Sequence, residues 1–162
     1  KRVAFNFAYE LAKEGFVIVS GLARGIDTYA HLGAVKANGK TIAVLGSGLK
    51  HISPAENKEL CNEIVKKGGA VITEYEPHIK PLPMNFPSRN RIISGLSNGV
   101  LVVEAKQKSG TLITVDYALE QGKDVFVIPG NITSTNSYGT NELIKQGAKP
   151  VTNIQEIIEE II

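Results

Sequence analysis

Hydrophobic residues in this chain alternate between helical spacing and short continuous runs. Val3, Phe7 and Leu11 recur at helical intervals, and Gly15 follows where a helix C-terminal cap is expected. Continuous apolar runs of strand length lie at residues 16–20, 41–45, 70–73, 100–104 and 125–128, and helical patterns lie between them at 26–34, 55–67, 88–96 and 111–121. Apolar strands separated by helices predict a three-layer α/β fold, doubly wound around a mostly parallel sheet with helices on both faces.

The C-terminal segment has a pattern of its own. Asn153 and Glu156 resemble a capping box at the start of a helix. One apolar stripe follows on that helix, made of Ile154, Ile157, Ile158, Ile161 and Ile162. We expect the stripe to pack on the domain, and the alternative is a surface for a partner subunit.

Length, charge and cysteine content limit the classes of function. The 162 residues, 43% of them apolar, predict a single soluble domain of residues 1–162. A net charge of +2 does not indicate nucleic-acid binding, so any anion site has to be local. The lone Cys61 and the absence of zinc-type spacing predict a reducing cytoplasmic setting with no internal disulfide and no structural metal. No cofactor is expected. No apolar stretch is long enough to span a membrane.

Because the chain begins at Lys1 inside a helical pattern, we expect the domain to lack its N-terminal part.

The most informative segment is FPSRNRIISGLS at residues 86–97. Arg89 and Arg91 offer planar donor groups for phosphate oxygens. Phe86 offers a face for a base, and Asn90 can donate to or accept from a base edge. These residues predict a site for a phosphate-bearing polymer.

A second interpretation of residues 86–97 requires no ligand. Pro87 and a Ser88 cap would start a surface helix, with Ile92, Ile93 and Leu96 turned inward. The two arginines would then only be solvated. The sequence by itself leaves both interpretations open.

Two glycine-containing loops follow predicted strands in the first half of the chain. In SGLARGID, at residues 20–27, Gly21 and Gly25 could bring N–H groups close to an anion at a helix N-terminus, and Arg24 adds a cation. The alternative is that the glycines serve only a tight turn and Asp27 only helix electrostatics. Gly46 and Gly48 resemble a dinucleotide fingerprint only weakly, since the third glycine would fall at His51 and no helix opens directly behind it.

A third loop, at residues 106–111, also suits phosphate, because it places amines, hydroxyls and a glycine at a helix start. These groups belong to Lys106, Lys108, Ser109, Gly110 and Thr111. The alternative is a solvated lysine pair with Thr111 as a helix cap. Residues 129–131 and 138–141 could complete the same rim, although turn chemistry explains Pro129 and Gly130 equally well.

Catalytic groups are harder to identify. Ser47 and Ser109 have no histidine and carboxylate partners at a recognisable spacing. Glu104 is the best general-base candidate, although a carboxylate at a strand end is more often a cap or an ion-pair partner. His31 and His51 are expected at helix and loop surfaces. These residues do not require an enzyme.

Taken in order, the motifs of the chain resemble the DprA/Smf DNA-processing family. They are FVIVSGLARGID, TIAVLGSGL, SPAEN, AVITE, FPSRNRIISGLS, VLVVEA, SGTLIT, GKDVFVIPG and GTNELIKQGA. The resemblance implies an extended Rossmann-like domain that binds single-stranded DNA without base specificity, forms a homodimer and loads the recombinase RecA during natural transformation. It implies no catalytic activity.

The resemblance also implies roles for individual residues. Phe86 would stack on a base, Arg89 and Arg91 would meet phosphates, and Asn90 would fix the loop or contact a base. The full set expected at DNA is Ser20, Gly21, Ala23, Arg24, Gly25, Gly46, Gly48, Phe86, Arg89, Asn90, Arg91, Lys106, Ser109, Gly110 and Thr111.

The chain departs from the family at several points. From the resemblance we expect a preceding strand and arginine-containing loop, an N-terminal helical domain and, in longer members, a C-terminal winged-helix domain, none of which lies within these 162 residues. Many family members have an aromatic residue before the proline of the SPAEN segment, where this chain has Ser53. The nearest cation upstream of Phe86 is Lys80.

The alternative function is a nucleotide-monophosphate phosphoribohydrolase of the lysine-decarboxylase-like Rossmann group. Those enzymes carry a PGGxGT loop, whereas the comparable residues 108–111 of this chain read KSGT. A further hypothesis, an NAD-dependent oxidoreductase, is supported only by Gly46 and Gly48.

Overall fold

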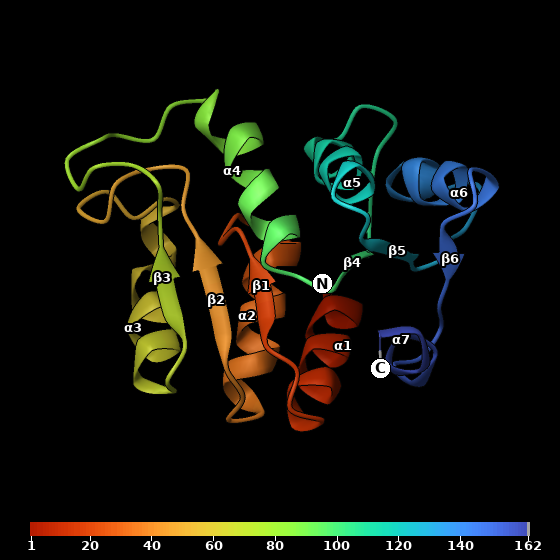
Figure 1. Cartoon of the computed structure of the whole chain (residues 1–162), viewed down its shortest axis with the longest axis horizontal. Coiled ribbons are helices and arrows are strands. Elements are labelled where there is room, and N and C mark those ends of the chain that lie inside the picture. Colours follow the sequence, from red (N-terminus) through yellow and green to blue (C-terminus); the bar gives the residue numbers. More distant parts are fainter. Residues whose placement is uncertain (162) are drawn as a thin grey trace. The chain divides into compact units, whose positions relative to one another are not determined.

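A computed structural model describes residues 1–161 and divides the chain into two compact units (Figure 1). The first unit comprises Lys1–Arg89, and the second begins at Asn90. Each unit is built around a parallel three-stranded sheet. The predicted α/β class with parallel strands and intervening helices is confirmed.

The first unit alternates helices and strands. Its elements are α1 (Arg2–Lys13), β1 (Ile18–Ser20), α2 (Ile26–Lys36), β2 (Thr41–Val44), the 3-10 turn η1 (Ala55–Asn57), α3 (Lys58–Lys66), β3 (Ala70–Ile72) and the first residues of α4 (Asn85–Gly95). The strand order is β1-β2-β3, with Ile18 opposite Thr41 and Ile42 opposite Ala70. Figure 1 shows α2 and α3 behind the same face of these strands. All three strands therefore end at one edge, where the loops after β1 and β2 lie.

Two apolar interfaces hold the first unit together. One lies between the sheet and its helices and is formed by Leu22, Ala43, Leu45, Leu60, Cys61 and Ile64. The other lies between α1 and α2, where a Cβ on Gly33 would overlap the carbonyl oxygen of Phe5. Small side chains on α1 allow this close approach, since Ala4 and Ala8 are buried. The alanine face of α1 points inward and leaves Val3 38% exposed.

The second unit repeats the alternation. It contains the rest of α4, then β4 (Gly99–Val102), α5 (Gly110–Glu120), β5 (Asp124–Val127), η2 (Thr135–Ser137), α6 (Tyr138–Lys145), β6 (Lys149–Pro150) and α7 (Gln155–Ile161). The strand order is β4-β5-β6. Its core is formed by Val102, Ala105, Val115, Ala118, Val125, Val127 and Leu143. The short strand β6 was not predicted, because Lys149 and Pro150 carry no strand pattern.

Two predicted helix starts are corrected. The helix α4 begins at Asn85, so Ser88 lies inside its first turn and does not cap it. Leu96 follows the helix and is 50% exposed, so it is not turned inward. In α5 the cap is Ser109, whose Oγ accepts from Thr111 N at 3.2 Å. Thr111 is therefore capped and is not itself the cap.

The C-terminal helix packs on its own unit, as expected. Ile157 of α7 is buried, and Ile154, Ile158 and Ile161 are half-buried. Asn153 Oδ1 accepts from Glu156 N at 3.3 Å, which is one half of the predicted capping box. The Glu156 carboxylate also accepts from the N–H of Thr152, one residue before the Asn153 N–H that a capping box uses. Ile162, the last member of the predicted stripe, lies outside the described residues.

Candidate nucleic-acid interface

Arg89 is the most deeply buried of the predicted DNA-binding side chains. Only 4% of the residue is exposed, and its Nη1 donates to the carbonyl oxygens of Gly21, at 2.7 Å, and Val44. These carbonyls lie at the carboxyl ends of β1 and β2. The helix α4 therefore places a guanidinium against two strand ends. For Arg89 the interpretation of a merely solvated arginine is wrong.

The environment of Arg89 combines burial with nearby acidic groups. Burial lowers the pKa of its guanidinium, because the charged form loses contact with water. Asp27 and Tyr75 act in the opposite direction and raise that pKa. Asp27 is thus the negative charge within the first unit that compensates this buried positive charge.

In the loop after β1, the N–H groups of Gly21, which was expected to face an anion, and of Ala23 bind a carboxylate of the chain itself. Asp27 Oδ2 accepts from Gly21 N at 3.0 Å and from Ala23 N at 3.3 Å. Asp27 belongs to the first turn of α2, where a negative charge also favours the helix dipole. Of the two interpretations left open for this loop, the anion site is therefore corrected at Gly21, whose N–H is already bound to Asp27. Asp27, to which the other interpretation gave only helix electrostatics, also holds the loop backbone.

The rest of this loop is held by contacts with η1. Arg24 makes a two-point ion pair with Glu56, at 2.7 and 2.8 Å. This pairing raises the pKa of Arg24 and lowers that of Glu56. The buried Asn57 donates to Leu22 O at 2.8 Å. Arg24 is thus paired within the chain, although its side chain is 74% exposed and such a surface pair exchanges readily with other anions.

The remaining residues of this loop differ in their accessibility. Ser20, the last residue of β1, is half-buried and Ala23 is exposed. Gly25 has a φ of +88° at the N-cap of α2, a backbone conformation that side chains disfavour. The turn itself therefore requires glycine at this position.

Phe86 lies in the first turn of α4 and is half-buried. A Cβ on Gly46 would lie 2.9 Å from its ring, and the Arg89 guanidinium lies 5.6 Å from the ring centroid. Gly46 therefore lets the aromatic ring approach the backbone that follows β2. The carboxyl edge of the first sheet thus carries an aromatic side chain that is still partly accessible.

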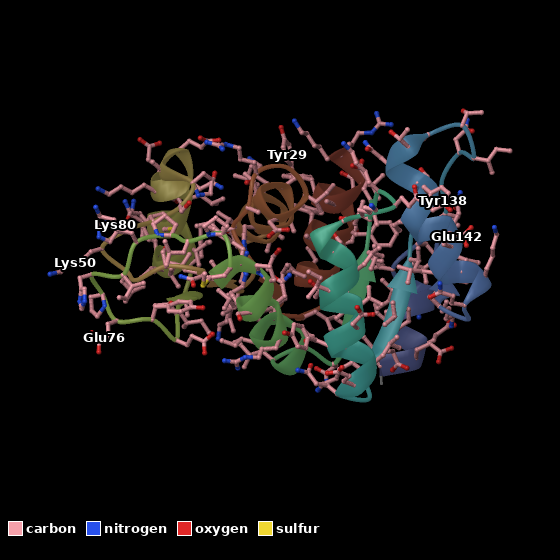
Figure 2. All side chains as sticks on the ribbon, turned by 90° about the horizontal axis from the view of Figure 1, so that it is seen from above. Tyr29, Lys50, Glu76, Lys80, Tyr138 and Glu142 are labelled. Atoms are coloured by element: carbon pink, nitrogen blue, oxygen red, sulfur yellow. The ribbon has the colours of Figure 1, made fainter. Side chains whose placement is uncertain are left out.

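Glycine at position 48 allows two loops to approach each other closely. A Cβ there would overlap the carbonyl oxygen of Glu76, and Gly48 N donates to Ile79 O at 2.8 Å. Figure 2 shows Lys50, Glu76 and Lys80 toward the outer end of these two loops. The residues after Gly48 form turns until η1, so no helix opens directly behind the glycines. This geometry does not match a dinucleotide fingerprint.

The second unit contains the other predicted residues. Asn90 Nδ2 donates to Gly110 O at 3.4 Å, which favours the first of its two expected roles, fixing the loop. The side chains of Arg91, Lys106 and Lys108 are exposed. A Cβ added to Gly110 would meet no atom within 4 Å, so there is open space beside its backbone. The segment 106–111 is therefore accessible and positively charged.

The two candidate nucleophilic serines make hydrogen bonds within their own loops. Ser47 is buried, and its hydroxyl donates to His51 O at 2.6 Å. Ser109 Oγ donates to Thr111 Oγ1 at 3.1 Å, and Glu104 is exposed. Within residues 1–161, no group of three or more histidine, cysteine and acidic residues is placed to hold a metal ion. None of the helices described is long and apolar enough to cross a bilayer.

His31 corrects a further expectation, because it is fully buried and does not lie on the surface. Its Nδ1 lies 2.7 Å from Thr41 Oγ1, which itself donates to Ile18 O at 2.6 Å. Since the Thr41 proton is used there, Nδ1–H is the donor to Thr41 and Nε2 is unprotonated. Burial and the charge of Arg89 lower the pKa of His31 to about 4. The helical pattern around His31 gave no signal for this burial, because its neighbours are partly polar.

Comparison with known proteins gives consistent matches over the whole chain. The family described as DNA recombination-mediator protein A matches residues 1–162. Protein Smf of Escherichia coli is 52% identical over 155 residues, which are 96% of this chain and 41% of that protein. The chain spans about half the length of the curated relatives it matches.

Two solved structures resemble the chain closely. DNA processing protein A (DprA) from Streptococcus pneumoniae superposes with a TM-score of 0.89 at 48% identity, covering 98% of this chain and 56% of that one. DNA processing protein A from Helicobacter pylori superposes with a TM-score of 0.87 at 34% identity, covering 99% of this chain and 72% of that one. The Helicobacter structure gives insights into the single-stranded DNA binding mode of that protein. Both matches agree with the α/β architecture described above.

Proposed function

Because the chain belongs to the DNA recombination-mediator protein A family, we propose that it binds single-stranded DNA without base specificity. The observation that carries the proposal is the half-exposed Phe86 ring at the carboxyl edge of the first sheet. Ligands of open α/β sheets bind at this edge. An aromatic face accepts any base, since every base has a π surface.

Phosphate contacts are assigned to exposed cations of the second unit. Arg91, Lys106 and Lys108 are accessible, and the open Gly110 lets a strand approach the N-terminus of α5. Arg24 is a further candidate if phosphate displaces Glu56. With a net charge of only +2, binding would depend on these local groups.

The biological setting is inferred from the family. We propose that the protein acts in natural transformation, protects incoming strands in the cytoplasm, forms a homodimer and loads RecA. The Helicobacter relative supports the DNA ligand, and the resemblance to DprA/Smf proteins supports the setting. No catalytic step is assigned to this role.

The proposal is tested by fluorescence anisotropy with labelled oligo-dT at several salt concentrations. Phe86→Leu should weaken binding by about fivefold or more with little change in salt slope, because stacking on one base contributes ~1–3 kcal/mol. Arg91→Ala should weaken binding and reduce the salt slope by about 0.7, the value for one phosphate contact on a single strand.

Arg2→Ala is the matched control, because Arg2 is an exposed arginine at the start of α1. It should bind like the parent. Equal binding by the parent, Phe86→Leu and Arg91→Ala would contradict the proposed function. A duplex of the same length should bind more weakly than oligo-dT, because its bases are already stacked.

A further inference from the structure

Gly21 lies between a positive and a negative side chain. Its N–H donates to Asp27 Oδ2 at 3.0 Å, and its carbonyl oxygen accepts from Arg89 Nη1 at 2.7 Å. A Cβ at this position would lie 2.6 Å from the Arg89 guanidinium carbon, so glycine is needed for the contact. One hydrogen bond at its N–H and another at its carbonyl oxygen therefore fix the Gly21 backbone.

The same guanidinium connects this loop with two other parts of the predicted interface. Nη1 also donates to Val44 O at the end of β2, and the guanidinium lies 5.6 Å from the centroid of the Phe86 ring. Phe86 precedes Arg89 by three residues on α4, so the two side chains are neighbours on one helix face. Holding Arg89 therefore also holds the turn that presents Phe86.

We propose that Arg89 is a positioning residue for DNA binding: with Asp27 it fixes Gly21 and the place of Phe86, and it does not contact phosphate. The inference rests on the proposed function, because it assigns a role within that same site. It differs from the role expected for Arg89 from the sequence, which was a phosphate contact. Exposed cations such as Arg91 are left to make such contacts.

The chemistry of the side chain supports this role. A phosphate contact needs an accessible guanidinium, whereas Arg89 is 4% exposed and donates to two backbone carbonyls. Both carbonyls accept from Nη1, whose two N–H bonds are held in the guanidinium plane and so point in fixed directions. The N–H bonds of a lysine ammonium are tetrahedral, and its side chain is shorter. Arg89→Lys therefore keeps the positive charge but loses the geometry.

The first experiment is a double-mutant cycle on oligo-dT affinity with Arg89→Lys, Phe86→Leu and the combined variant. A residue that acts through Phe86 gives non-additive effects. Arg89→Lys should weaken binding about fivefold in the parent but less than about twofold in Phe86→Leu. Arg89→Ala should leave the salt slope at the parent value, unlike Arg91→Ala. Thermal melts establish that each variant is folded at the temperature used.

The second experiment needs no DNA. Arg89→Lys should speed amide hydrogen exchange at Gly21 and Ala23, whose N–H groups bind Asp27, by about tenfold or more. Exchange in β4 and β5, which belong to the other unit, reports any global loss of stability, and the acceleration at Gly21 and Ala23 should exceed the one seen there. Arg24→Lys is the matched control in the same loop, because its exposed pairing with Glu56 contributes little to stability.

The outcomes separate this inference from the proposed function. Additive losses in the cycle, a reduced salt slope for Arg89→Ala, or parent-like DNA binding by Arg89→Lys would each overturn the positioning role while leaving DNA binding in place. Unchanged exchange at Gly21 and Ala23 in Arg89→Lys would overturn it as well. If Phe86→Leu and Arg91→Ala both bind like the parent, the proposed function fails first, and the positioning role fails with it.

Discussion

At the scale of single residues, the first unit uses buried polar side chains to hold backbone carbonyls. Arg89 binds two strand ends, Asn57 binds Leu22 O, and Thr41 binds Ile18 O. Each pairing satisfies a backbone acceptor that would otherwise be costly to bury. His31 donates to Thr41 in the same network and is neutral there. Its protonation would place a charge in this buried region.

His31 makes the stability of the protein depend on pH. Its folded-state pKa of about 4 lies below the ordinary value of 6.5, so between these values the unfolded state binds more protons. The stabilisation is therefore complete above about pH 6.5 and is lost as the pH falls toward 4. The loss should be on the order of 3 kcal/mol in the free energy of unfolding, measured by urea denaturation.

His31→Gln is the test of this assignment. The variant should show a smaller decrease in unfolding free energy between pH 7 and pH 4.5 than the parent, because it has no imidazole to protonate. His78→Gln, which changes an exposed histidine, should keep the parent's decrease. An identical decrease in the parent and His31→Gln would contradict the role of His31.

The arginine cluster shows how far sequence reasoning reaches at this scale. Arg89 and Arg91 occur two residues apart in the same motif, and sequence reasoning predicts the same phosphate-binding role for both. A spacing of two places them on different faces of α4, so Arg89 is buried and Arg91 is exposed. Which face meets the sheet depends on contacts with Gly21 and Val44, which are distant in sequence. No local pattern contains that information.

At the scale of elements, the close packing of α1 on α2 depends on Gly33. We predict that Gly33→Ala lowers the free energy of unfolding by ~1–3 kcal/mol, because the new Cβ would overlap the backbone carbonyl of Phe5 and force the helices apart. Urea denaturation measures the loss. Gly110→Ala is the matched control, since an added Cβ at the first residue of α5 meets nothing within 4 Å. Equal stability of the two variants would contradict this packing argument.

Element positions were mostly predictable from the sequence. All five predicted strands form, each shifted or shortened by one or two residues at its ends. The start of α4 was missed because Pro87 and Ser88 suggested a boundary, whereas proline is also tolerated inside the first helical turn. Local periodicity identifies the elements, while their exact ends depend on neighbouring segments.

At the scale of the whole molecule, the single domain expected from length stays a prediction. If the chain is one cooperative domain, amide exchange in the buried strands β2 and β5 should report the same free energy of opening, for example at Ala43 and Phe126. Gly33→Ala, although it lies in the first unit, should then lower both values equally. A decrease confined to β2 would show that the two units unfold independently.

The sequence by itself determined the α/β class, the alternation of elements and the loops that follow the strands. These properties arise from short-range periodicity and turn residues, which every local segment carries. Only the tertiary structure decided that Asp27 occupies the N–H groups of Gly21 and Ala23, that Gly48 admits a neighbouring loop, and that Arg89 is buried. Each of these outcomes depends on groups that folding brings within a few ångströms, and the pattern along the chain does not specify those distances.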